Sequence, residues 1–186
     1  MSRKIDKADL LLALERDVEK HLDEAVRSYQ NWTPERLLKK PEDGGWSVAE
    51  CLWHLNSYGN YYLPRIEEQF SRPVGDHATF QSSWLGAWFT RMMRPGPRMK
   101  KYKAFRNHVP PPIGDPLSVV ADFITQQEKL LALLRRARSA DLNRLRIGIS
   151  IMPWLTMKLG DVFQFLVAHQ ERHMVQALRV ATEAAG

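Results

Sequence analysis

The sequence predicts an all-α protein, an up-down-down-up four-helix bundle with a long basic crossover between the second and third helices. Three observations predict this class. Apolar residues repeat at helical spacing in four segments, helix-start signals precede several of these segments, and the links between them are unequal in length. A chain of 186 residues, with 44% hydrophobic and 26% charged residues, is typical of one globular domain, which we place over residues 1–186.

The first helix is expected over about residues 6–30. Its apolar positions recur every four residues, and Leu11 and Ala25 widen the predicted buried face. The recurring positions are Leu10, Leu14, Val18, Leu22 and Val26. Thr33 and Pro34 then predict one short helical turn, because proline suits the first helical position. A proline and two glycines prevent regular structure beyond that turn: Pro41, Gly44 and Gly45.

The second helix is expected from Ser47 to about Phe70. In the segment SVAE, the Ser47 hydroxyl can accept a hydrogen bond from the backbone of Glu50, whose side chain can accept one from the backbone of Ser47. This reciprocal pair is a capping box. An apolar stripe follows it, formed by Val48, Leu52, Leu55, Gly59, Tyr62 and Ile66. Pro64 inside the stripe predicts a kink rather than the end of the helix.

The third and fourth helices are expected over about residues 116–138 and 160–182. Asp115 precedes a proline at the first position of the third helix, which is a strong helix-start signal. Between the two helices, residues 144–160 alternate in hydropathy too briefly to predict a strand, and Pro153 interrupts them. We therefore expect a largely irregular connection there.

The link between the second and third helices is the longest, at roughly 40 residues, which favours a crossover that leaves these two helices parallel. Residues 77–114 of this link contain no acidic residue and seven cations, whereas the rest of the chain has a net charge of −1. The cations are Arg91, Arg94, Arg98, Lys100, Lys101, Lys103 and Arg106. Interspersed aromatic residues leave four interpretations open: a lid over an anionic substrate, a nucleic-acid surface, a homodimer contact, or an ordinary crossover that buries its aromatic residues and exposes its cations. We favour the ordinary crossover, because no nucleic-acid-binding motif accompanies the cations.

The single cysteine and the absence of long apolar segments bear on the compartment. Cys51 is the only cysteine, so an intrachain disulfide and a C-x-x-C zinc site are both excluded. No segment approaches the roughly 18 consecutive apolar residues that a membrane span requires. We expect a cytoplasmic protein with no membrane partner.

His169 and His173 lie four residues apart on the apolar side of the predicted fourth helix. Two buried, titratable rings at this spacing are costly unless something binds them, and neutral imidazole is a common ligand of divalent metals. His54, beside the apolar stripe of the second helix, is the candidate for a third ligand. Spacing alone leaves two alternatives open, a three-histidine metal site and core histidines that are satisfied by hydrogen bonds.

The other three histidines are not expected in this site. His21 stands among charged residues on the first helix and should face solvent. His77 and His108 flank the basic segment and should belong to loops. Glu171, two positions after His169, should point away from the site. Gln176, one turn beyond His173, either orients a ligand or a histidine, or is a polar group that closes the core.

The segments GGWSVAECLWHLNSYGNYYL and AHQERHMVQ resemble two motifs of the DinB/YfiT-like superfamily, W-S-x-x-E-x-L-x-H-L in the second helix and H-x-x-x-H-x-x-Q in the terminal helix. Both motifs occur in the family's order and on the expected helices. The resemblance implies an up-down-down-up bundle in which His54, His169 and His173 hold a divalent metal, zinc or nickel for instance. Residues 1–186 would then form a single DinB-like domain.

The resemblance also implies a range of activities, which includes metal-dependent hydrolases and S-transferases or isomerases that use a low-molecular-weight thiol. Three neutral imidazoles leave an ion its full charge and at least one open position, which is typical of a catalytic site. Water bound there becomes a nucleophile, or a thiol binds as its thiolate. We expect a metal-dependent enzyme acting on a small molecule as a hydrolase or thiol S-transferase, with a non-catalytic metal- or ligand-binding, stress-related module as the alternative.

Overall fold

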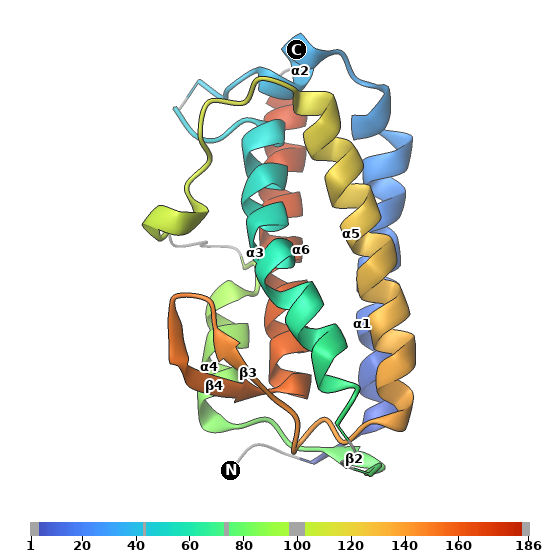
Figure 1. The fold of residues 1–186 in the computed structure, drawn as a ribbon. Coiled ribbons are helices and arrows are strands. Elements are labelled where there is room, and N and C mark those ends of the chain that lie inside the picture. The colour runs from blue at the N-terminus through green and yellow to red at the C-terminus, as the bar shows by residue number, and fades with distance from the viewer. Residues whose placement is uncertain (1–3, 43, 73–74, 97–102, 184–186) are drawn as a thin grey trace.

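Four long helices lie side by side in the computed structural model, which describes residues 4–42, 44–72, 75–96 and 103–183 (Figure 1). They are α1 (Lys7–Arg27), α3 (Val48–Gln69), α5 (Pro116–Arg136) and α6 (Leu159–Glu183). Each coincides with a helix expected from the sequence, with ends that differ by up to three residues. The helical class is therefore confirmed for the bundle, although two small sheets accompany it.

Each long helix packs against two others, so α3 contacts α5 and α6, and α1 contacts the same two helices. The Lys7 ammonium at the start of α1 donates to the carbonyl oxygens of Arg138 and Ala140, 2.7 and 3.2 Å away, just beyond the end of α5. Figure 1 shows α1 and α6 beginning, and α3 and α5 ending, at this same end of the bundle. The adjacent pair α3 and α6 therefore runs antiparallel.

The helix starts agree with the signals in the sequence. The Ser47 backbone N–H donates to Glu50 Oε2 at 2.9 Å, and the Glu50 N–H donates to Ser47 Oγ at 3.2 Å, so the capping box is present. Asp115 accepts from two backbone N–H groups at the start of α5, and Thr33 caps the short helix α2 (Pro34–Leu38). Helix α3 runs through Pro64 without ending.

The crossover between α3 and α5 contains structure that was not expected. Helix α4 (Trp84–Met93) packs on α6, and ahead of it strand β2 (Thr79–Phe80) pairs antiparallel with strand β1 (Ile5–Asp6), which precedes α1. The aromatic residues of α4 differ in exposure: Phe89 is buried, whereas Trp84 is 80% exposed. Three of the seven cationic residues of the segment 77–114 lie outside the described residues: Arg98, Lys100 and Lys101.

The expectation of an irregular link before α6 is wrong, because strands β3 (Arg146–Ile149) and β4 (Met152–Lys158) form an antiparallel hairpin. Ile147 and Ile149 are buried and alternate with less buried neighbours, which is the pattern of a half-buried strand. The pairing is irregular between Gly148 and Ile149. Gly148 also admits the Pro153 carbonyl, since a Cβ on this glycine would lie 2.6 Å from that oxygen. A bulge of this kind lets a two-stranded sheet tolerate proline.

The apolar core has two clusters with the histidines between them. On α6 the first cluster ends at Val167 and the second begins at Met174, so His169 lies between them. On α1 the corresponding residue is His21, which is 1% exposed, and the expectation that it faces solvent is wrong. The physical reason is that the buried stripe of α1 uses alternating steps of three and four rather than uniform steps of four. Its members are Leu11, Leu14, Val18, His21 and Ala25.

No helix within the described ranges combines the length and the apolar character that crossing a membrane requires.

Candidate metal centre

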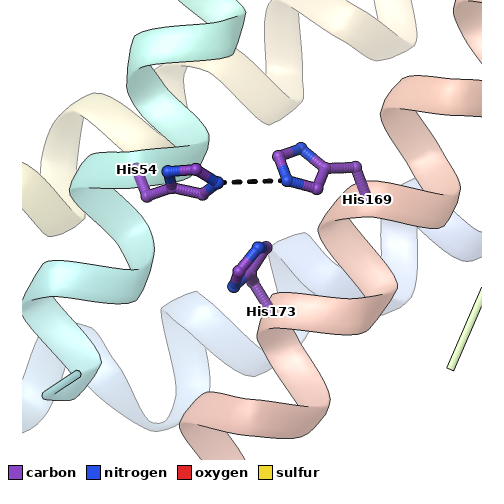
Figure 2. Close-up of side chains that lie close together, drawn as sticks. All are labelled: His54, His169 and His173. Atoms are coloured by element: carbon purple, nitrogen blue, oxygen red, sulfur yellow. Dashed lines mark hydrogen bonds between the residues drawn. The ribbon is translucent and has the colours of Figure 1, made fainter. Parts of the chain in front are cut away.

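Three histidine side chains converge between α3 and α6 (Figure 2). His54 comes from α3, and His169 and His173 come from successive turns of α6. Each ring offers a nitrogen, and the three nitrogens all lie within 4.8 Å of one another. Nε2 of His54 lies 3.1 Å from Nε2 of His169. The inward orientation expected from helical spacing is therefore present, with exposures of 3%, 3% and 8%.

Hydrogen bonds fix which nitrogen carries the proton on two of these rings. His54 Nδ1 lies 2.6 Å from the backbone oxygen of His108, and a carbonyl oxygen only accepts, so Nδ1 is the protonated nitrogen. His173 Nδ1 donates in the same way to Gln176 Oε1 at 3.1 Å. In the neutral rings, Nε2 of both histidines therefore carries a lone pair.

Burial keeps the three rings neutral. Loss of solvation lowers the pKa of His54 from 6.5 to about 4 and the pKa of His173 to about 3. Desolvation, reinforced by repulsion from the other rings, also places the pKa of His169 well below its usual value. At neutral pH the site thus presents uncharged nitrogen donors, which is the protonation state that metal ligation requires.

Aromatic side chains enclose the histidines. The Phe165 ring stacks on His169 with centroids 5.6 Å apart and planes 13° apart. Tyr58 meets His169 edge-on at 4.5 Å, and half-buried Trp46 stacks on His173 at 5.9 Å. These contacts restrict the ring orientations and contribute to the burial of the cluster.

His108 is a component of the site that the sequence did not reveal. It was expected in a loop, but it lies in the short 3₁₀ helix η2 (Arg106–His108) and is 5% exposed. Its backbone oxygen accepts from His54, and its ring contacts Ser57 and Ser150. The sequence spacing gave no signal of this, because 54 residues separate His108 from His54. His77, in contrast, is exposed in a loop as expected.

Glu171 points away from the cluster, as expected, and faces α1. Its Oε2 lies 2.7 Å from His21 Nε2, and its Oε1 lies 3.3 Å from the Lys20 ammonium. The hydrogen bond to His21 is the main reason that the pKa of Glu171 falls to about 2. This carboxylate is therefore occupied by α1 and is not a base for chemistry at the three histidines.

The donor set fits a divalent metal ion. His54 and His173 both present Nε2 lone pairs, and the single Nε2 hydrogen that His169 can supply satisfies only one of them. His169 Nδ1 is also buried without a hydrogen-bond partner among the described residues. A cation accepts several lone pairs at once, and imidazole nitrogen suits zinc, nickel and similar ions. In the part of the chain that the structure describes, no carboxylate or thiol joins the group.

Two surface grooves have volumes of about 410 and 370 Å³, and neither is lined by the three histidines. The smaller groove runs between α1 and α6 past Glu171 and Ala168, on another face of α6. Half-buried Trp46 packs against both His54 and His173, with ring centroids 4.9 and 5.9 Å apart.

The fold and the site together define a class, a helical bundle in which two adjacent antiparallel helices enclose three neutral histidines. The DinB superfamily model matches residues 15–177, and the chain belongs to the DinB superfamily.

Among solved structures, the chain is similar to YfiT from Bacillus subtilis, with 17% sequence identity and a TM-score of 0.55. The match covers 95% of this chain and 86% of the YfiT chain. YfiT is described as a probable metal-dependent hydrolase with an unusual four-helix bundle topology. A search of curated proteins found no significant match.

Proposed function

We propose that this protein is a metal-dependent enzyme that acts on a small molecule at a divalent ion, zinc or nickel, held by His54, His169 and His173. The observation that carries the proposal is the convergence of three neutral ring nitrogens within 4.8 Å. Such an ion supplies Lewis acidity, which lowers the pKa of a water molecule or of a low-molecular-weight thiol. The description of YfiT as a probable metal-dependent hydrolase supports hydrolysis ahead of thiol S-transfer.

The side chains around the histidines have distinct roles in this proposal. The His108 carbonyl and the Gln176 amide oxygen each hold one Nδ1 hydrogen, so the Nε2 atoms of His54 and His173 stay available. Tyr58 and Phe165 keep the histidine rings oriented. Proton transfer during turnover would rely on groups of the substrate or solvent, because Glu171 is bound to α1.

We further propose that residues 1–186 form one DinB-like domain with an up-down-down-up helix order. The shared ends of α1 with α6 and of α3 with α5 support this order. Both apolar clusters draw on α3, α5 and α6, which supports a single cooperative unit.

The alternative is a metal- or ligand-binding module without turnover. The observation that favours it is the low exposure of the three histidines, between 3% and 8%. An exchangeable ligand separates the two functions. Azide or a small thiol should perturb the visible spectrum of the cobalt-loaded protein if a coordination position is open to substrate, and should leave it unchanged in a sealed module.

The decisive experiment combines metal analysis with one substitution. Protein purified without an affinity tag should contain about one equivalent of zinc or nickel, and His173→Ala should lose most metal binding while its far-ultraviolet circular dichroism stays helical. The control is His77→Ala, because His77 is exposed in a loop. Removing metal should also lower the melting temperature, since an ion at one hundred times its Kd stabilises the fold by about 2.7 kcal/mol.

Wild-type metal affinity in His173→Ala would exclude ligation by this residue. The activity itself is tested by assaying the metal-loaded protein against amide and ester substrates, and against electrophiles with a panel of low-molecular-weight thiols. Turnover that disappears with chelation and returns with metal would support a metal-dependent enzyme. A requirement for a thiol would identify an S-transferase, and turnover without a thiol would identify a hydrolase.

A further inference from the structure

His108 connects the histidine cluster to two segments outside the bundle. Its backbone oxygen accepts from His54 Nδ1 at 2.6 Å, which is a short and well-buried bond. Its ring nitrogens contact Ser57 Oγ of α3 at 2.8 Å and Ser150 Oγ, in the turn between β3 and β4, at 3.2 Å. One residue of the crossover thus touches a candidate metal ligand, its helix and the hairpin.

A single arrangement of hydrogens satisfies this network. The Ser57 hydroxyl donates to the backbone oxygen of His54 at 2.6 Å, so its oxygen is free to accept from His108 Nδ1–H. His108 Nε2 then carries the lone pair and accepts from the Ser150 hydroxyl. Every polar group of the His108 ring has a partner, which fixes the ring and with it the attached carbonyl.

Packing holds the same arrangement in place. The Tyr58 ring stacks on the His108 ring with centroids 3.8 Å apart and planes 22° apart. The Ser150 backbone N–H donates to the Tyr62 hydroxyl at 3.1 Å, so the hairpin turn is also fixed to α3. Without such contacts a one-turn 3₁₀ helix, flanked by extended residues on both sides, has little of its own to fix the direction of its carbonyl groups.

We infer that His108 is a positioning residue of the proposed metal centre, acting through its backbone oxygen on His54, while its ring holds that oxygen in place. This inference rests on the proposed function. A ligating histidine that donates its second ring N–H to a fixed oxygen keeps its orientation and binds metal more strongly, and losing such a partner costs about 10–100-fold in metal affinity. The crossover and the hairpin are therefore parts of the metal centre.

The test is metal binding to the full-length protein, measured by competition for Zn²⁺ and by the visible absorption of the Co²⁺ form. His108→Ala removes the ring but keeps the carbonyl, and should weaken Zn²⁺ binding about 10–100-fold and alter the cobalt bands at saturating metal. His108→Asn should recover much of the loss, because its amide N–H can replace Nδ1–H toward Ser57. The matched control, His77→Ala, should bind as the parent does.

Each result has a definite meaning. Parent-like affinity and cobalt bands in His108→Ala, alongside lost binding in His173→Ala, would overturn the positioning role and leave the metal site intact. Absence of metal binding by the parent would overturn both proposals. If His108→Ala does not fold, Ser57→Ala and Ser150→Ala decide, since each removes one contact of the ring. Weakened binding in either supports the inference, and unchanged binding in both contradicts it.

Discussion

Acidification should destabilise the metal-free protein through its buried histidines. The pKa of His54 is about 4 and that of His173 about 3 in the folded state, against 6.5 when unperturbed. Because each folded pKa lies below the unfolded one, the unfolded state binds more protons. The stability is therefore fully present above pH 6.5 and is lost as the pH falls toward the folded values. At pH 5 each such ring lowers the free energy of unfolding by about 2 kcal/mol relative to neutral pH. Around this pH the free energy of unfolding changes by about 1.4 kcal/mol per pH unit for each ring.

The assay is urea unfolding of chelator-treated protein between pH 7.5 and 4.5. The test variant is His169→Gln, which removes a titrating ring whose pKa is strongly lowered by burial. Between pH 6.5 and 4.5 the free energy of unfolding of His169→Gln should change less steeply with pH than that of the parent. The difference should be about 1.4 kcal/mol per pH unit, which corresponds to the uptake of about one proton. His77→Gln, a substitution of an exposed loop residue, is the matched control. Equal slopes in the parent and His169→Gln would refute the reasoning that His169 is buried and neutral.

Three further substitutions test the surroundings of the site. Ser47→Ala removes the side-chain cap of α3 and should lower the free energy of unfolding by about 1 kcal/mol in urea titrations; no change would mean that the cap is dispensable. Glu171→Gln weakens the partner of buried His21 and should cost about 1–3 kcal/mol without changing metal affinity, and a large affinity loss would contradict its orientation toward α1. Gly86→Ala would bring a Cβ into collision with the Asp161 side chain, so we expect a loss of about 1–3 kcal/mol in thermal unfolding, and wild-type stability would show that the contact relaxes freely.

Much of the bundle was predictable because its signals are local. The capping box at Ser47 and the proline after Asp115 fix helix starts, and the apolar spacing of each helix selects a buried side. The same spacing predicted that His54, His169 and His173 face inward, and the structure shows all three buried together. Their ligation of a metal remains a proposal.

The rest depends on contacts between distant segments. His21 looked polar because its sequence neighbours are charged, yet a step of three from Val18 places it on the buried side, where Glu171 of α6 can pair with it. His108 is buried only because the crossover folds back onto α3 and meets the β3–β4 turn. Helix α4 was not expected, and two of its large apolar residues, Trp84 and Trp88, are exposed while Phe89 packs in the core.

The two parts of the histidine cluster are separated by 115 residues of chain, between His54 and His169. At about 5–20 residues per second, a ribosome needs roughly 6–23 s to add that length. During this interval His54 is already synthesised while its partners do not exist, and one histidine is a weak ligand on its own. Under the proposed function, the complete set of three nitrogen donors therefore exists only once α6 has been synthesised and packed against α3, so metal binding at full affinity depends on the docking of the last helix.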